Sequence, residues 1–180
     1  YTLWHTLSLH DALPISKHLR KVKAAKGLQK IVAKVEQFNY VSLEDLLEEN
    51  STVVFLDGIN DPQNLGVIMR TLACLGGFSM VIPQKGCCGV NDTVMHVATG
   101  GENYVPVAQV ASLSDAVQRT KDAGVTIVGT LVDKRDTRLI DTVCFPFPLG
   151  IVFGAEGDGI RKSIHSLLGF LMENSIASCS

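Results

Sequence analysis

The sequence has 180 residues, of which 46% are hydrophobic, and its formal net charge is −2 at pH 7. A chain of this length supports one domain with a buried core and is short for two. It has no apolar run of the about 18 residues that a membrane helix needs, and its five cysteines have no metal-ligand spacing. We therefore expect a cytoplasmic protein with reduced thiols, no membrane contact and no metal site.

Both ends of the chain have an unusual sequence. Residues 1–16 read YTLWHTLSLHDALPIS, with no initiator Met and no clear periodicity. This is typical of translated adaptor sequence, so we treat these residues as a non-native leader that has no part in the fold. The other end stops at SIASCS without a helix cap or a polar tail. We expect a fragment that is truncated at both ends.

The composition of residues 17–50 predicts a basic arm or linker. Seven of the 16 basic residues lie between positions 17 and 34, where the chain has no Asp or Glu. A basic helix over 17–38 is typical of a nucleic-acid contact, with Lys21, Lys23 and Lys26 as candidates, although a solvated helix face gives the same pattern. Ser42 and Asp45 then have the spacing of a capping box, which predicts a short helix.

The remaining chain alternates between apolar runs and amphipathic segments. Strands are predicted at residues 52–56, 79–83, 104–109, 125–130 and 149–153. Helices are predicted at residues 62–75, 92–99, 112–123 and 160–168, and residues 131–142 are a polar connection. Strands that alternate with helices, each a nearly continuous run of Val, Ile or Leu, indicate an α/β fold whose parallel sheet is covered by helices on both faces.

Unusual polar residues follow the first predicted strand. Asp61 and Pro62 are good N-cap and first-turn residues for the helix over 62–75, and Asn64 lies near its free N–H groups. Gly66 precedes Arg70 by one helical turn, so we expect Gly66 to leave room beside an arginine that binds a phosphate or a carboxylate. The alternative is a capped helix with an exposed Arg70.

The loop GAEGDG follows the last predicted strand, at residues 154–159. Its three glycines around Glu156 permit a close backbone approach to a ligand, although a tight turn is an equally good interpretation. The loop is not the GxGxxG sequence of dinucleotide-binding proteins, which belongs after the first strand, so a Rossmann-type enzyme is not favoured.

The two segments together resemble a known family. NDPQNLGVIMRT at residues 60–71 and IVFGAEGDGI at residues 151–160 are similar, in order, spacing and strand context, to motifs 1 and 2 of the SpoU (TrmH-type) branch of the SPOUT RNA methyltransferases. The resemblance covers about residues 40–178. It is strongest to the bacterial 23S rRNA guanosine 2′-O-methyltransferase group.

The resemblance implies a fold and an activity for residues 51–180. The fold is an α/β parallel sheet with a C-terminal trefoil knot, which we expect to be incomplete here. The activity is transfer of a methyl group from S-adenosyl-L-methionine to a ribose 2′-hydroxyl of RNA by a homodimer. By matching position, the catalytic residues are Asn64, Arg70 and Glu156. We favour Arg70 as an electrostatic stabiliser that also contacts RNA rather than as a base, because a guanidinium stays protonated in proteins.

The resemblance also implies a cofactor site between two loops and the C-terminal segment. In that segment Cys179 stands where the family has Leu, and the chain ends at Ser180, where the family has Asn. The cofactor-binding residues implied are Thr130, Leu131, Gly154, Phe170, Met172, Ser178 and Cys179.

The RNA substrate stays open between two candidates. A guanosine of 23S rRNA is the first, and tRNA guanosine-18 is the alternative. A different class of protein, a catalytically silent RNA-binding relative or fragment, is a further alternative, since most of the family's N-terminal RNA-binding region has no counterpart in residues 17–50.

Overall fold

The computed structural model describes residues 38–49, 51–131, 137–139 and 144–173. They belong to a compact unit that begins at Phe38. The predicted leader, the basic helix and its candidate contacts Lys21, Lys23 and Lys26 lie outside the described residues, as do Ser178 and Cys179.

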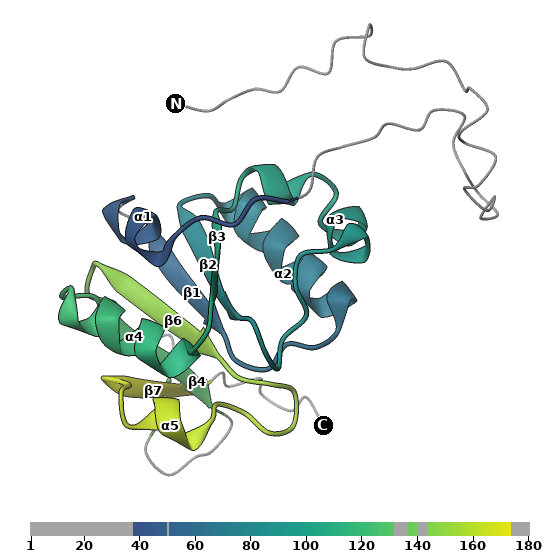
Figure 1. The fold of residues 1–180 in the computed structure, drawn as a ribbon. Coiled ribbons are helices and arrows are strands. Elements are labelled where there is room, and N and C mark those ends of the chain that lie inside the picture. The colour runs from purple at the N-terminus through teal and green to yellow at the C-terminus, as the bar shows by residue number, and fades with distance from the viewer. Residues whose placement is uncertain (1–37, 50, 132–136, 140–143, 174–180) are drawn as a thin grey trace, which may run out of the picture. The chain divides into compact units, whose positions relative to one another are not determined.

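A parallel sheet forms the centre of this unit (Figure 1). In the described part of the chain it has seven strands in the order β3-β2-β1-β6-β4-β7-β5. Every pairing between neighbouring strands is parallel. The strands are β1 Thr52–Leu56, β2 Phe78–Pro83, β3 Val107–Val110, β4 Thr126–Leu131, β5 Thr137–Leu139, β6 Leu149–Phe153 and β7 Phe170–Glu173.

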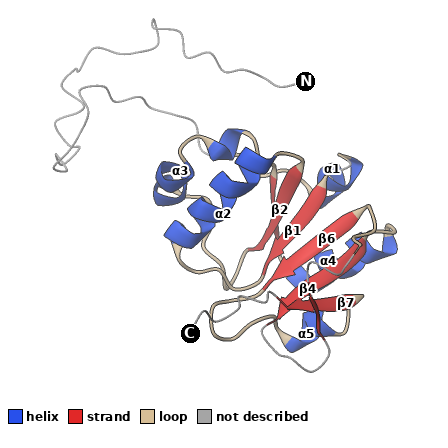
Figure 2. Ribbon diagram, turned by 180° about the vertical axis from the view of Figure 1, so that it is seen from behind, coloured by secondary structure: helices blue, strands red, loops and turns tan. Residues whose placement is uncertain are grey.

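Helices cover two faces of the sheet (Figure 2). On one face α2 (Pro62–Leu75) and α3 (Asp92–Ala98) pack over β1, β2 and β3, and on the other lie α1 (Leu43–Glu48), α4 (Leu113–Asp122) and α5 (Lys162–His165). Alternate residues of β1 belong to different core clusters: Val54 packs with α2, whereas Phe55 packs with α1 and α4. This explains why the strand reads as a continuous apolar run, as the sequence predicted.

Local capping signals produce the helix starts that the sequence predicted. The Asp45 N–H donates to Ser42 Oγ (3.1 Å) and the Ser42 N–H donates to Asp45 Oδ2 (3.3 Å), which completes the capping box. The carboxylate of Asp61 accepts the N–H of Gln63 at 2.8 Å, with Pro62 as the first helical residue. Because these contacts join residues close in sequence, they do not depend on the rest of the fold.

Residues 38–49, which the sequence assigned to the linker, pack on the sheet. The Val41 N–H donates to the carbonyl of Val107 (2.9 Å) in edge strand β3, and the Tyr40 hydroxyl accepts the N–H of Val90 (2.8 Å). Leu43 and Leu46, on the inner face of α1, are buried in the core. The compact unit therefore begins before the boundary expected at residue 51.

Several predicted element boundaries were wrong. The predicted strand over 104–109 begins only at Val107, because a 3-10 turn at Gly101–Asn103 and a turn at Tyr104 precede it. The predicted helix over 160–168 is shortened to Lys162–His165, because the Gly169 N–H donates to the carbonyl of Ile127 (2.7 Å) and turns the chain into the sheet.

Two strands were not predicted at all. β5 lies within the predicted polar connection, and β7 lies in the C-terminal segment that the sequence left without a strand. β7 pairs with β4 on one side and with β5 on the other. Strands of three or four residues are too short to show a hydrophobic periodicity. Their hydrogen bonds also come from partners distant in sequence, which no local pattern indicates.

No helix in the described residues is long and apolar enough to cross a bilayer.

Candidate active site

The candidate site lies at the carboxyl ends of β1, β4, β6 and β7. Leu56 pairs with Phe153, so the loop that follows β1 and the loop that follows β6 leave the sheet side by side. Thr130 of β4 pairs with Met172 of β7. The sequence predicted Asn64, Gly154 and Glu156 in the segments that follow β1 and β6, where parallel sheets bind ligands.

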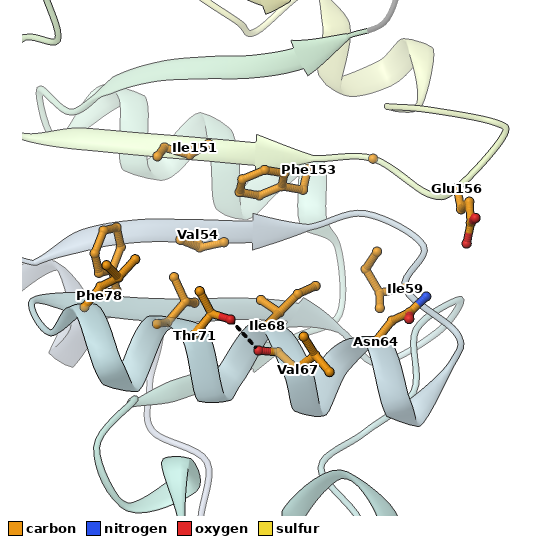
Figure 3. Close-up of a pocket in the computed structure, with 13 residues that line it drawn as sticks. Val54, Ile59, Asn64, Val67, Ile68, Thr71, Phe78, Ile151, Phe153 and Glu156 are labelled. Atoms are coloured by element: carbon orange, nitrogen blue, oxygen red, sulfur yellow. Dashed lines mark hydrogen bonds between the residues drawn. The ribbon is translucent and has the colours of Figure 1, made fainter. Parts of the chain in front are cut away.

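Asn64 and Glu156 lie at the same end of one pocket (Figure 3). The pocket has a volume of about 630 Å³ and runs between α2 and strands β1 and β6. Asn64 comes from the first turn of α2, and Gly154 and Glu156 come from the loop after β6. The structure thus brings together two predicted catalytic residues and one predicted cofactor residue.

Away from that polar end the pocket is lined almost entirely by apolar side chains. Among the described residues that line it, Thr71 is the one further polar residue, and Phe78 marks the end opposite Asn64 and Glu156 (Figure 3). This combination of an apolar wall and a few polar groups is typical of a site for an organic ligand. The apolar lining residues are Val54, Ile59, Val67, Ile68, Leu72, Leu75, Phe78, Ile151 and Phe153.

The loop after β6 is closed on itself. Ala155 and Gly159 exchange backbone hydrogen bonds of 3.1 and 3.0 Å, with Glu156 at the exposed tip between them. A Cβ at Gly154 would lie 2.2 Å from the carbonyl carbon of Gly159, so no other residue fits there without moving the loop. Glycine at position 154 thus lets the chain fold back immediately after β6.

Arg70 lies on a different face of α2 from Asn64. It is exposed, and it does not border the pocket. A Cβ at Gly101 would lie 3.1 Å from the Cα of Arg70, so the 3-10 turn Gly101–Asn103 packs against the helix backbone there. The structure therefore leaves the guanidinium on the surface and does not group it with Asn64 and Glu156.

The expectation that Gly66 leaves room beside Arg70 was wrong. A Cβ at Gly66 would meet the carbonyl oxygen of Val94 at 2.8 Å and the Cβ of Val97 at 2.6 Å. The missing side chain is thus required by the contact between α2 and α3. Sequence spacing shows which residues share a helix face but not what covers that face.

The predicted cofactor residues lie on neighbouring strands. Thr130 Oγ1 donates to the carbonyl of Val152 (3.3 Å) in β6, beside Gly154. Leu131 pairs with Glu173 at the end of β7, and Phe170 pairs with Val128. The carboxyl ends of the strands therefore bring together Thr130, Leu131, Gly154 and Met172. Phe170 is the first residue of β7 and lies toward the other end of that strand.

The sequence analysis missed two candidate residues of the site, Asp57 and Arg161. Asp57, the residue after β1, is 1% exposed and binds the backbone and the side chain of Arg161. The signal was a carboxylate directly after a wholly apolar strand, since a buried charge requires a partner. The identity of the partner was hidden, because Arg161 lies 104 positions later.

Cys87 and Cys88 hold the loop that leads into α2. The Cys87 thiol and the Cys88 N–H both donate to the carbonyl of Ile59, each at 2.9 Å. Burial raises the pKa of the Cys87 thiol from 9.0 to about 12, and burial also raises that of Cys88. A thiol held protonated in this way is a packing group and not a nucleophile. The described residues contain no group of three or more His, Cys, Asp or Glu that could hold a metal ion.

Residues 51–173 match the SpoU rRNA Methylase family. The chain is 35% identical over 165 residues to the 23S rRNA (guanosine-2′-O-)-methyltransferase RlmB of Nitrosomonas europaea, covering 89% of the chain and 63% of that relative. It is 36% identical over 138 residues to an uncharacterized tRNA/rRNA methyltransferase of Synechocystis, covering 73% of the chain and 35% of that relative. The chain thus spans between about a third and two thirds of these relatives.

The fold is also similar to solved structures. The AdoMet-bound rRNA methyltransferase of Sinorhizobium meliloti superposes with a TM-score of 0.69 at 24% identity, covering 79% of this chain and 54% of that one. At this identity the likeness establishes a common fold, in which the sheet and its flanking helices correspond.

Proposed function

The chain belongs to the SpoU rRNA methylase family, and from this premise we propose that the whole protein transfers a methyl group from S-adenosyl-L-methionine to a ribose 2′-hydroxyl of structured RNA. The observation that carries the proposal is the shared pocket of Asn64, Gly154 and Glu156, formed by two segments far apart in sequence. A cytoplasmic location is part of the same proposal.

The carboxyl ends of β4, β6 and β7 provide groups that suit the cofactor. The half-buried Thr130 hydroxyl and the backbone around Gly154 are polar groups at these strand ends, where parallel folds bind nucleotides. Thr130, Leu131, Gly154, Phe170 and Met172 would hold it, together with Ser178 and Cys179 from the C-terminal segment. When bound, S-adenosyl-L-methionine supplies a methyl group that is already activated by the sulfonium.

The residues of the chain then have to position the ribose and favour loss of its 2′-hydroxyl proton. The Asn64 amide and the Glu156 carboxylate orient the ribose at the polar end of the pocket. Arg70 lies outside the pocket, and its role is to bind a phosphate of the RNA whose ribose enters the pocket and, once that RNA is bound, to stabilise the developing negative charge of the 2′-oxygen. The exposed position of Arg70 supports a role toward an incoming RNA chain.

We also propose a C-terminal trefoil knot and a homodimer for the whole protein. β7 is the last strand in the described chain, yet it lies between β4 and β5, which supports a threaded C-terminal segment. Val67, Leu75 and Phe153 are large apolar side chains exposed around the pocket, which supports a face that becomes buried in a dimer.

A guanosine of 23S rRNA is the proposed target. The similarity to a relative named for that substrate supports it. Other relatives are named for tRNA or rRNA, so tRNA guanosine-18 is the second candidate. A catalytically silent RNA-binding protein is less favoured, because Asn64 and Glu156 are both present and meet at one pocket.

The first experiment is a calorimetric titration of the protein with S-adenosylhomocysteine, followed by methyl transfer to purified 23S rRNA and tRNA. Binding, together with transfer that Asn64→Ala and Glu156→Gln reduce by about a hundredfold, supports the proposal. Arg119→Met, on the surface of α4, is the control and should transfer at the normal rate. Cofactor binding without transfer to either RNA would favour the silent alternative.

A further inference from the structure

Asp57 is a buried carboxylate whose oxygens are both occupied. Oδ2 accepts the backbone N–H of Arg161 at 2.8 Å. Oδ1 accepts the Nε–H of Arg161 at 2.6 Å and lies 2.6 Å from Nη2 of the same side chain. A charged group that is 1% exposed is costly to bury, so this arginine is required to compensate it.

The backbone of Asp57 holds a second attachment to the same loop. Its N–H donates to the carbonyl of Phe153 at 2.8 Å. Phe153 is the last residue of β6 and directly precedes residues 154–160, and Arg161 directly follows them and comes just before α5. One residue at the end of β1 is therefore bonded to both ends of residues 154–160.

Contacts within and beside the loop complete this attachment. The reciprocal bonds between Ala155 and Gly159 close its middle. The residue after Asp57 is Gly58, where a Cβ would lie 3.0 Å from the Cβ of Ala155. The two loops are thus in direct contact, with Asp57 between them, and a shift at Asp57 changes their relative position.

We propose that Asp57 is a positioning residue for the reaction: by holding both ends of residues 154–160, it sets the place of Glu156 relative to Asn64. This inference rests on the proposed function. Asp57 leads through residues 58–61 into α2 and Asn64, while its carboxylate fixes the loop of Gly154 and Glu156. The side chain and the backbone of Asp57 thus both join the two halves of the site.

The alternative is that the ion pair only stabilises the fold. The two roles differ in what the substitution Asp57→Asn changes. Asparagine keeps the size and one acceptor oxygen, but it removes the charge and places N–H groups toward the guanidinium. A stabilising role predicts loss of structure throughout the sheet, whereas a positioning role predicts loss of order in residues 154–160 and slower chemistry in a folded protein.

The test compares Asp57→Asn, Arg161→Met and the double variant in the whole protein. The matched control is Arg119→Met, which removes the ion pair between Arg119 and Glu44, exposed on both partners. Amide hydrogen exchange is measured at Ala155 and Gly159 in the loop and at Val81 in β2. Methyl transfer is measured as kcat and as KM for RNA.

We expect exchange at Ala155 and Gly159 to rise about tenfold or more in Asp57→Asn, because the charge-assisted hydrogen bonds to Arg161 at one end of the loop are lost, while the backbone bond to Phe153 stays. Exchange at Val81 should change no more than in the control. We expect kcat to fall about tenfold or more while KM for RNA stays within about twofold, since misplacement of catalytic groups acts on the chemical step. The double variant should resemble Asp57→Asn, because both substitutions break the same contact.

Two results would overturn the inference while leaving the proposed function intact. One is equal exchange in the loop of Asp57→Asn and of the unsubstituted protein. The other is an unchanged kcat in a variant whose loop exchanges faster. A protein that binds no S-adenosylhomocysteine and transfers no methyl group overturns the proposed function, and with it the positioning role of Asp57 in the reaction. Exchange at Ala155 and Gly159 still decides whether Asp57 anchors the loop.

Discussion

A Cβ placed on Gly66 of α2 would lie 2.6 Å from the Cβ of Val97 in α3, closer than side chains approach one another. The two helices therefore pack backbone to side chain at this point, and the hydrogen of Gly66 is the only substituent that fits. This contact fixes α2, and so fixes Asn64 in its first turn beside the pocket.

Gly66→Ala should destabilise the protein by about 1–3 kcal/mol, although alanine favours helices, because the added methyl group overpacks the contact with Val97 and with the Val94 carbonyl. Denaturant unfolding measures the change. Gln63→Ala, at an exposed position of the same helix, should change the free energy of unfolding by about 0.5 kcal/mol or less. Equal stability of Gly66→Ala and the unsubstituted protein would show that α3 moves away freely.

Gly154→Ala should weaken S-adenosylhomocysteine binding by about tenfold or more, because a methyl group at this position displaces residues 159 and 160 and opens the loop beside the cofactor. Calorimetric titration measures the dissociation constant. Ser166→Ala, an exposed substitution at the end of α5, is the control and should bind normally. Undiminished binding by Gly154→Ala would place the cofactor away from this loop.

Arg70→Lys should lower the rate of methyl transfer by roughly tenfold to a hundredfold, because lysine keeps the charge but not the planar fork. The shape of the rate–pH profile should stay the same, since neither cation acts as a base in our proposal. Arg119→Lys on α4 tests the same exchange at a site remote from the pocket. A profile displaced by several pH units in Arg70→Lys would instead indicate that residue 70 removes the proton.

Cys87 should react with iodoacetamide at least about tenfold more slowly than the exposed Cys74 at about pH 8, because burial holds the Cys87 thiol protonated, with a pKa of about 12. Peptide mass spectrometry after timed alkylation measures both rates. In urea the two cysteines should react alike. Rapid labelling of Cys87 in the folded protein would contradict the buried position.

The same raised pKa makes a prediction about stability in alkaline solution. Below the ordinary thiol pKa of 9.0 both folded and unfolded chains keep the Cys87 proton, and the buried thiol makes its full contribution to the free energy of unfolding. As the pH rises above 9.0, the unfolded chain releases this proton before the folded one does, so stability falls. The decline should be smaller in Cys87→Ala, as measured by thermal unfolding between about pH 8 and pH 10.

Local sequence determined the elements that depend on neighbouring residues. The capping box of Ser42 and Asp45 and the start of α2 at Asp61 and Pro62 were confirmed, because each is formed within one helical turn. The parallel arrangement could also be predicted, since strands buried on both faces read as continuous apolar runs. The paired segments 60–71 and 151–160 likewise identified the family, and their sharing of one pocket agrees with that identification.

Only the tertiary structure decided the contacts between distant residues. The position of β7 between β4 and β5, the packing of Gly66 against α3 and the attachment of Arg161 to Asp57 join segments that no local pattern relates. The physical reason is the difference in what each signal encodes. Helix caps and hydrophobic periods depend on interactions between residues close in sequence. A strand order or a buried ion pair depends on which distant segments of the chain pair with each other, and this is determined only when the core packs.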